Sequence, residues 1–428
     1  MASAEFPIHQ VLSFKAQALE WGAQQDQLCY LDSNAYASSD RYGRYEALIA
    51  IGCRAKIEQM ASLGKGGAFD ALQSFQQRQK DWLFGYLGYD LKNDIEQLQS
   101  TNTDRMAWPD LHFFVPEYVL EVFKDRVCIH SHEERPEQIF EAIQQIQLSS
   151  QETLLSPLHL EASLSQSAYE NIIRALKTHI VEGDIYEINF CQAFFARECQ
   201  MNPLAMYRQL NRLSPTPFSA FYRQGDRYLL CASPERFIQK RGRKLISQPI
   251  KGTIRRGETW VEDVQLKDQL LHSEKDRAEN VMIVDLVRND LARSCEPGSI
   301  KVEELFGIYG FEQVHQMIST VTGQMRSDCT GIEAIKHAFP MGSMTGAPKV
   351  MSMQLIEAYE NTRRGLYSGA LGYIRPDGDF DFNVVIRSML YQAEQALLSF
   401  QVGGAIVYDS VPALEYEECL LKAKALIT

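Results

Sequence analysis

The chain has 428 residues, which is enough for two or three domain cores or for one large core. Its 45% hydrophobic and 23% charged residues are ordinary values for a globular protein, and no stretch of apolar residues is long enough to predict a membrane span. The net charge of −12 and the lack of a Lys/Arg run argue against a nucleic-acid partner.

Cysteine usage and the N-terminus both bear on the cell compartment. The nine cysteines contain no C-x-x-C pair, so the sequence predicts neither a disulfide framework nor a zinc ribbon. The first ten residues lack the basic segment and apolar core of a signal peptide. We therefore expect reduced, mostly buried thiols in a cytoplasmic protein.

Two regions follow one another along the chain. Residues 1–150 mix helical patterns with short aromatic strands at 82–89 and 111–115, and a polar stretch at 148–157 predicts a connector. Residues 165–428 contain consecutive strand-like segments, at 228–232, 244–250, 366–374, 382–391 and 396–402. Consecutive strands without intervening helices favour an α+β fold with antiparallel sheets over a doubly wound parallel sheet.

Two residues of the second region have the chemistry of an acid and a nucleophile. Glu235 follows a predicted strand, where a carboxylic acid facing a closed pocket could protonate a departing hydroxyl; the alternative is a surface ion pair with Arg236. Lys251 stands beside Gly252 in a predicted turn. Most such lysines are solvated, and a nucleophilic one needs a depressed pKa.

Two predicted helices each carry a pair of carboxylates three residues apart. Asp276 and Glu279 continue a core-facing stripe of the helix near 273–287, and Glu415 and Glu418 share a face of a C-terminal helix that opens at Pro412. Acids in a first helical turn are often there only to suit the helix dipole. If the two helices converge, however, their oxygens are of the kind that Mg²⁺ accepts.

Two glycine-containing segments complete the candidate site. The turn at 339–349 precedes a predicted helix, so its amides could bind an anion at the helix N-terminus. It lacks the spacing of a phosphate loop, and we expect a carboxylate ligand. Gly403 and Gly404 lie in a strand with little side-chain bulk, which permits either close ligand approach or tight packing.

In this order, the segments resemble the chorismate-utilising enzymes: the large subunits of anthranilate and aminodeoxychorismate synthases, and the isochorismate and salicylate synthases. The matching stretches are GDIYEINF (183–190), ASPERF (232–237), PIKGT (249–253), ENVMIVDLVRND (279–290), His315 with STV (319–321), GSMTGAPK (342–349), YSG (367–369), NVVIR (383–387) and EYEE (415–418). The resemblance implies a layered α+β fold of the anthranilate synthase component I type, with antiparallel sheets forming a β-sandwich core flanked by helices.

The resemblance also implies roles for individual residues. Glu279 and Glu418 would bind Mg²⁺, supported by Asp276 and Glu415, and Glu235 would be the general acid. The implied substrate-binding residues are Arg387, Tyr367, Gly403, Gly404, Thr345, Gly346, His315 and Asn189.

Lys251 and Asn189 resemble the aminodeoxychorismate branch of the family, because anthranilate-forming members usually have Ala at the position of Lys251. The resemblance implies that Lys251 attacks ring C2 of chorismate and expels the C4 hydroxyl, after which ammonia adds at C4. Glu187 stands where Gln is common and where the isochorismate and salicylate synthases have a water-activating Lys.

The chain shows no nucleophilic cysteine motif, so the implied ammonia source is glutamine, acted on by a separate amidotransferase subunit. The implied product is 4-amino-4-deoxychorismate, on the route to 4-aminobenzoate and folate. Two alternatives stay open: an anthranilate synthase large subunit, and a non-catalytic chorismate-binding regulatory protein.

Overall fold

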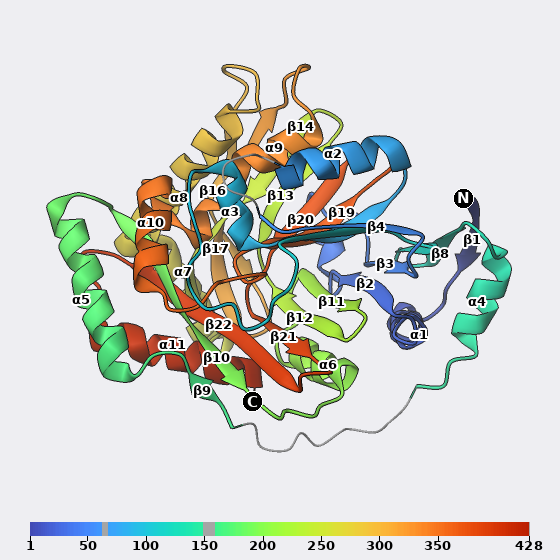
Figure 1. Cartoon of the computed structure of the whole chain (residues 1–428), viewed down its shortest axis with the longest axis horizontal. Coiled ribbons are helices and arrows are strands. Elements are labelled where there is room, and N and C mark those ends of the chain that lie inside the picture. Colours follow the sequence, from blue (N-terminus) through green and yellow to red (C-terminus); the bar gives the residue numbers. More distant parts are fainter. Residues whose placement is uncertain (62–66, 149–158, 428) are drawn as a thin grey trace.

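The computed structural model describes residues 1–61, 67–148 and 159–427. Two large sheets face each other, and helices cover their outer sides (Figure 1). Every strand pairing in the two sheets is antiparallel. The predicted α+β class with antiparallel sheets and flanking helices is therefore confirmed.

The first sheet has 12 strands in the order β1-β8-β7-β3-β2-β11-β12-β21-β22-β10-β18, with β9 paired to β10. Their bounds are β1 (Ala2–Pro7), β2 (Gln27–Asp32), β3 (Ala47–Ile51), β7 (Tyr118–Val122), β8 (Arg126–Ser131), β9 (Glu161–Ala162), β10 (Glu187–Ala196), β11 (Phe218–Gln224), β12 (Arg227–Ser233), β18 (Gly346–Ala347), β21 (Ser388–Gln392) and β22 (Leu397–Ile406).

The second sheet has 10 strands in the order β15-β17-β14-β13-β20-β19-β5-β6-β4, with β16 paired to β17. Their bounds are β4 (Ala55–Gln59), β5 (Leu83–Leu87), β6 (Leu111–Val115), β13 (Arg236–Arg241), β14 (Lys244–Gln248), β15 (Ile250–Arg255), β16 (Lys301–Gly310), β17 (Val314–Gln324), β19 (Ala370–Ile374) and β20 (Phe380–Val384).

The helices are α1 (Val11–Gly22), α2 (Gly67–Gln79), α3 (Lys92–Ile95), α4 (Pro136–Gln144), α5 (Gln166–Glu182), α6 (Pro203–Leu213), α7 (Trp260–His272), α8 (Glu274–Ala292), α9 (Gly331–Ala338), α10 (Lys349–Tyr359) and α11 (Pro412–Ile427). Three short 3-10 turns are η1 (Tyr36–Ser38), η2 (Tyr89–Leu91) and η3 (Gly342–Met344). No helix in the described part of the chain is long and apolar enough to span a membrane.

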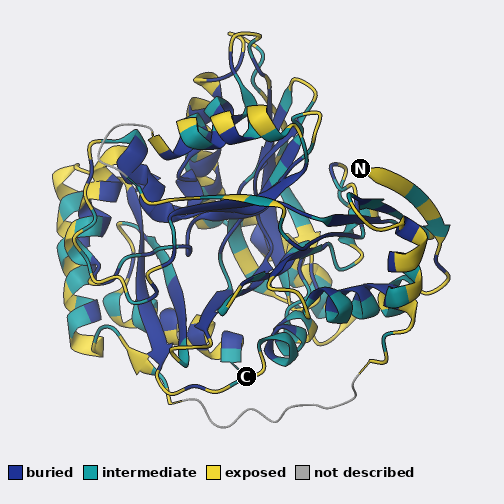
Figure 2. Ribbon diagram, turned by 45° about the vertical axis from the view of Figure 1, so that its right-hand side comes forward, coloured by how far each residue is buried: buried dark blue, intermediate teal, exposed yellow. Residues whose placement is uncertain are grey.

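Three hydrophobic clusters hold the layers together. Phe84, Tyr222 and Leu371 belong to a cluster between the two sheets. Helices α1, α4, α5, α6 and α11 pack on the first sheet, and α2, α8 and α9 pack on the second. Figure 2 shows the result: most strands are buried throughout, whereas the outer helices alternate buried and exposed faces. Full burial of one large apolar side chain stabilises the fold by about 1.5–3 kcal/mol.

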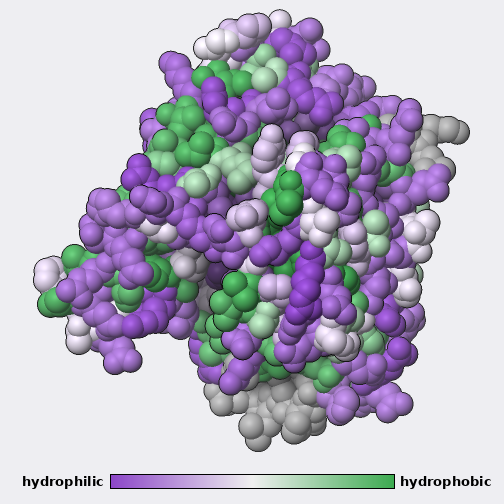
Figure 3. All heavy atoms as spheres, turned by 90° about the vertical axis from the view of Figure 1, so that its left-hand side faces the viewer, coloured by the Kyte–Doolittle hydropathy of each residue, from purple (hydrophilic) through white to green (hydrophobic). Residues whose placement is uncertain are grey.

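The outer face that carries α5 and α11 is mostly hydrophilic, with hydrophobic atoms in separate groups (Figure 3). Exposed apolar residues on these two helices include Val181, Leu414 and Leu421. The buried stripes of the same helices face the sheet, as their amphipathic patterns predict.

The predicted strands are mostly confirmed, with three differences. The segment 244–250 is interrupted at Pro249, between β14 and β15. The segment 366–374 becomes a strand only from Ala370, and the segment 382–391 divides into β20 and β21. The division falls near Arg387, whose φ of +49° is incompatible with a continuous strand. The predicted connector at 148–157 lies outside the described residues except for Leu148.

Strands from residues 1–150 and from residues 165–428 are hydrogen-bonded into the same sheets. In the first sheet β2 pairs with β11, and in the second β5 pairs with β19. The division at 150 and 165 stays a prediction about domain organisation. Because both regions contribute strands to each sheet, the N-terminal strands help to fix the positions of β10, β12 and β13, which hold the candidate site.

Candidate active site

Lys251 lies in strand β15 of the second sheet, and its side chain contacts Glu187, the first residue of β10 in the first sheet. Its Nζ donates a hydrogen bond of 2.5 Å to Oε1 of Glu187, and the two side chains are only 11% and 2% exposed. Instead of the predicted turn, the backbone here is an irregular strand whose register shifts between Ile250 and Thr253. The solvated alternative for Lys251 is therefore wrong.

The surroundings of Lys251 hold it in its charged form. Burial lowers the pKa of Lys251, but the Glu187 carboxylate raises it more, with smaller contributions from Glu279 and Glu235, so that the net pKa is raised. The depressed pKa that a nucleophilic lysine needs is thus not found in this arrangement. Lys251 rests as an ammonium group and must lose a proton before its nitrogen can attack carbon.

Glu235 occupies the short connection between β12 and β13 and is only 5% exposed. Burial raises the pKa of Glu235 to about 7, although Ser343 and Lys251 act in the opposite direction. Arg236 does not pair with it; its guanidinium binds Asp381 and Asp40 at 2.9 and 2.8 Å. The surface ion-pair alternative is therefore wrong, and Glu235 can donate a proton near neutral pH.

The predicted carboxylate pairs lie on α8 and α11. Glu279 is 14% exposed in its side chain, and burial raises its pKa. On α11, Oε2 of Glu415 and Oε1 of Glu418 come within 3.5 and 3.7 Å of where a side chain on Gly404 would begin. The carboxylates of Glu415 and Glu418 therefore both lie next to strand β22 at Gly404.

Shared lysines relate the acids of the two helices. Burial raises the pKa of Glu418, but Lys422, Lys275 and Lys251 lower it more, and the net pKa is lowered. Lys275 and Lys251 also lower the pKa of Glu279. Lys275 and Lys251 thus act on the pKa of carboxylates from both α8 and α11. Among the described residues, however, neither Glu279 nor Glu418 has two further metal-ligand atoms close enough to form a preformed cluster.

The donor set fits a hard cation. All four predicted ligands offer carboxylate oxygens, which Mg²⁺ prefers. Lysine ammonium groups stand beside two of them, with Lys422 at 2.6 Å from Glu418 and Lys275 at 3.9 Å from Glu279. Positive charge is therefore already held at these carboxylates by flexible side chains that can move aside.

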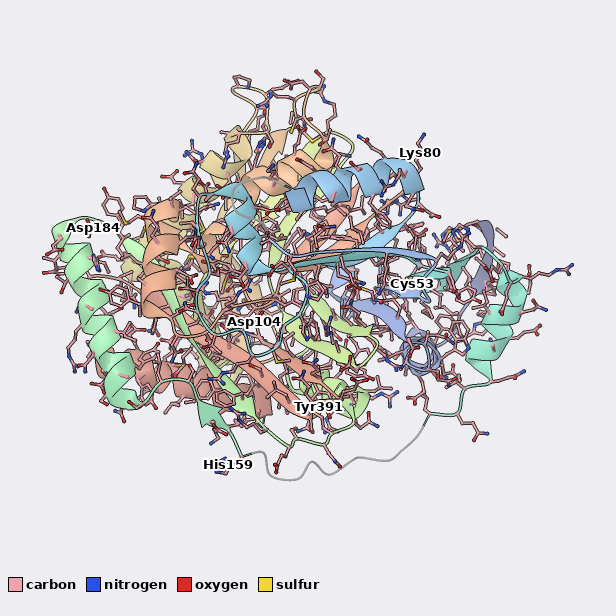
Figure 4. All side chains as sticks on the ribbon, in the orientation of Figure 1. Cys53, Lys80, Asp104, His159, Asp184 and Tyr391 are labelled. Carbon is pink, nitrogen blue, oxygen red and sulfur yellow. The ribbon has the colours of Figure 1, made fainter. Side chains whose placement is uncertain are left out.

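Within the described ranges, His179, Glu182 and Asp184 form a further group of possible metal ligands. Asp184 lies just beyond α5 at the outer edge of the molecule (Figure 4). Both ring nitrogens of His179 are already engaged, by Asp184 at 2.7 Å and by the hydroxyl of Tyr359 at 3.0 Å. We therefore interpret these three residues as stabilising the C-terminal end of α5, and not as a metal site.

The glycine turn packs directly on the start of β10. The amide of Asn189 donates to the carbonyl of Thr345 at 2.8 Å, and Gly346 has a φ of +147°. A side chain on Gly346 would begin 2.2 Å from the carbonyl oxygen of Glu187, so only glycine fits. A side chain on Gly403 would likewise begin 2.1 Å from the carbonyl of Phe190, which makes tight strand packing the reason for that glycine.

Arg387 has the features of an anion-binding residue. Burial lowers the pKa of its guanidinium, and no carboxylate among the described residues pairs with it. Its positive φ is a strained conformation for a non-glycine residue, of the kind that collects at functional sites. A substrate carboxylate would supply the missing partner.

Two other predicted substrate-binding residues have contacts elsewhere. Tyr367 is buried near Cys191 and Arg364, and burial raises its pKa. His315 is opposite Ile254 in β15, and its Nε2 binds Asp263 of α7 at 3.0 Å. These contacts fix both residues in the fold but do not join them to Lys251 or Glu235.

The sequence interpretation missed a buried ion pair behind the site. Arg364 is 2% exposed and binds Glu360 at 2.6 Å. It also donates to the carbonyl oxygens of Met344 at 2.6 Å and Asn189 at 2.8 Å, which ties the glycine turn to β10. The only local signal was the four-residue spacing of Glu360 and Arg364, which is common on exposed helices.

Comparison with known proteins agrees with this geometry. A family model described as chorismate binding enzyme matches residues 29–428. Aminodeoxychorismate synthase component 1 of Klebsiella aerogenes is 37% identical over 347 residues, which cover 80% of this chain and 76% of the relative. An anthranilate synthase component I-like protein of Synechocystis is 35% identical over 354 residues, which cover 81% of this chain and 72% of the relative.

Among solved structures, anthranilate synthase component I of Streptococcus pneumoniae superimposes with a TM-score of 0.76 at 28% identity, covering 89% of this chain and 91% of that one. The predicted fold type is thereby confirmed. Sequence match and three-dimensional likeness together show that the chain belongs to the family of chorismate binding enzymes.

Proposed function

We propose that the chain is the large subunit of an aminodeoxychorismate synthase and converts chorismate and ammonia to 4-amino-4-deoxychorismate. The observation that carries the proposal is the buried pair of Lys251 and Glu187 close to Glu235, an acid with a pKa of about 7. An amine nucleophile and a protonated acid in one site are what addition at C2 with loss of the C4 hydroxyl requires.

The proposed reaction balances its protons among three side chains. Lys251 passes a proton to Glu187, and its neutral amine forms a bond to C2 while the C4–O bond breaks and Glu235 protonates the leaving hydroxide to water. Ammonia then bonds to C4 as the C2–N bond to Lys251 breaks. The new C4 ammonium group returns a proton to Glu235, and Glu187 returns its proton to the departing amine of Lys251.

In this proposal Mg²⁺ is held by Glu279 and Glu418, with Asp276 and Glu415 in support. When bound, the ion neutralises a substrate carboxylate and stabilises charge as the double bonds shift. Arg387 binds the other carboxylate, because its partly buried guanidinium has no protein partner among the described residues. Gly346, next to Thr345, pairs with β10 on one side, and Gly404 pairs with β10 from β22 on the other side.

Ammonia is expected from a separate glutamine amidotransferase subunit. A glutaminase of the cysteine type needs an activated thiolate. Burial raises the pKa of all nine cysteine thiols of this chain, among them Cys191 and Cys419. None of these nine thiols is therefore poised to attack glutamine, and in this proposal the nitrogen comes from a separate subunit or from free ammonium.

The test is a product assay of the purified chain with chorismate, Mg²⁺ and ammonium at alkaline pH, analysed by chromatography and mass. We expect 4-amino-4-deoxychorismate from the wild type and at least about a hundredfold less from Lys251→Ala. Lys240→Ala, which removes another buried lysine of the second sheet, serves as the control. Anthranilate from the wild type would move the chain to the anthranilate branch, and chorismate binding without turnover would favour the regulatory alternative.

A further inference from the structure

One face of β10 carries buried hydrogen-bond acceptors that the protein leaves without donors. Glu187 and Asn189 are alternate residues of the strand, so their side chains point to the same side, and they are 1% and 9% exposed. Oε2 of Glu187 and Oδ1 of Asn189 are buried without a hydrogen-bond partner.

Buried polar atoms without partners are rare, because each loses its hydrogen bonds to water and gains none in return. Two such acceptors on one strand face, beside a proposed nucleophile, indicate a ligand that supplies donors. Chorismate supplies few: its carboxylates and enol ether oxygen only accept hydrogen bonds, and its one O–H donor is the C4 hydroxyl that leaves in the reaction. Ammonia has three N–H donors and ammonium has four, so a small nitrogen species matches these acceptors better.

We propose that Oε2 of Glu187 and Oδ1 of Asn189 form the subsite that binds ammonia or ammonium, an inference that rests on the proposed function. Glu187 then holds two nitrogens with one carboxylate. Oε1 binds Nζ of Lys251 at 2.5 Å, and Oε2 binds the incoming nitrogen. The two amines that bond in turn to the same substrate ring are thereby kept side by side.

The surrounding structure keeps both acceptors in place. Arg364 donates to the backbone carbonyl of Asn189 at 2.8 Å, and the amide of Asn189 donates to Thr345. Nδ2 of Asn189 points toward the carbonyl of Ser343 at 3.5 Å, which leaves Oδ1 for a ligand. Before Lys251 passes its proton to Glu187, the negative charge of Glu187 favours ammonium over water, which offers only two donors and no charge. The ammonium then releases one proton to solvent, and ammonia is the species whose nitrogen bonds to C4.

The test is steady-state kinetics with ammonium chloride as the only nitrogen source, at fixed pH with Mg²⁺, varying ammonium and chorismate separately. For Glu187→Gln we expect the KM for ammonium to rise about tenfold or more, because a charge-assisted hydrogen bond is lost. For Asn189→Leu, which keeps the pair of Lys251 and Glu187, we expect a rise of about fivefold. The KM for chorismate should change less than about twofold in both.

Gln192→Met is the matched control. Gln192 lies on the same strand, is 1% exposed and also has a buried oxygen without a partner, but its side chain faces Cys419 of α11. Its KM for ammonium should equal that of the wild type.

An unchanged KM for ammonium in Asn189→Leu, or a parallel rise of both KM values, would overturn the subsite even if Glu187→Gln proves inactive. The product that the wild type makes tests the proposed function independently of these KM measurements. A wild type that makes anthranilate refutes amination at C4 and still allows the KM measurement, and a wild type that aminates nothing overturns both proposals.

Discussion

Replacing Glu235 with Gln should stabilise the chain at pH 8 and at the same time remove most of its activity. The two effects have one cause, the burial that raises the pKa of Glu235 to about 7. At pH 7 about half of the Glu235 carboxyls are protonated, whereas an exposed glutamate is protonated in only about one molecule in several hundred. The fold thus keeps an acid in its protonated form at the cost of stability.

The sign of the pH dependence follows from linkage. The folded chain binds this proton more tightly than the unfolded chain, so the stabilisation is fully present below pH of about 4.5 and is lost as the pH rises through about 7. The difference of roughly 2.5 pKa units corresponds to about 3 kcal/mol, to order of magnitude. Gln is isosteric and does not ionise, so Glu235→Gln removes this loss.

The assay is urea unfolding of the wild type and Glu235→Gln at pH 5 and pH 8, with turnover measured on the same samples. We expect the variant to gain stability relative to wild type only at pH 8, and its kcat to fall by about 10²–10⁴ as expected for a lost general acid. Glu394→Gln, at an exposed turn, controls for removal of one charge. Equal pH dependence in Glu235→Gln and wild type, or retained turnover, would refute the reasoning.

Three further predictions concern the substrate, the metal and the support of the site. Arg387→Ala should raise the KM for chorismate by about 10- to 100-fold with a smaller change in kcat, because a charge-assisted contact of about 1.5–3 kcal/mol is lost. Initial-rate measurements give both constants. An unchanged KM would mean that the substrate carboxylate binds elsewhere. Chelation with EDTA should abolish turnover and added Mg²⁺ should restore it, and Glu279→Gln should need a higher Mg²⁺ concentration for half-maximal rate; EDTA-resistant turnover would contradict the metal site. Arg364→Met should destabilise the fold by about 3–5 kcal/mol in urea unfolding, because it leaves Glu360 buried and unpaired. The double variant with Glu360→Leu should recover part of the lost free energy of unfolding, and no recovery would mean that the two side chains are not coupled.

Local patterns in the sequence predicted the elements that depend on local signals. The amphipathic stripe that places Asp276 and Glu279 on one face is present in α8, and the helix that begins at Pro412 ends at Ile427, close to the chain end. Both follow from hydrophobic periodicity and helix-start signals that act within a few residues. The antiparallel class followed in the same way from consecutive strands without helices between them.

The features that the sequence could not predict depend on contacts between distant segments. Lys251 looked like a turn residue because glycine stands next to it, yet pairing with β17 makes it part of a strand. Its raised pKa depends on Glu187, 64 positions away in the chain. Burial likewise decided the state of Glu235, whose neighbour Arg236 turns away to Asp40 and Asp381. Motif resemblance named these residues but not their protonation.

The most direct test of the central claim is intact-protein and peptide mass spectrometry of the chain mixed with chorismate and Mg²⁺ and no nitrogen source. The account predicts a covalent adduct with the mass of chorismate minus water, located on Lys251, which disappears when ammonium is added and 4-amino-4-deoxychorismate forms. Aminated product formed at the same rate by Lys251→Ala, or an adduct on a residue other than Lys251, would contradict it.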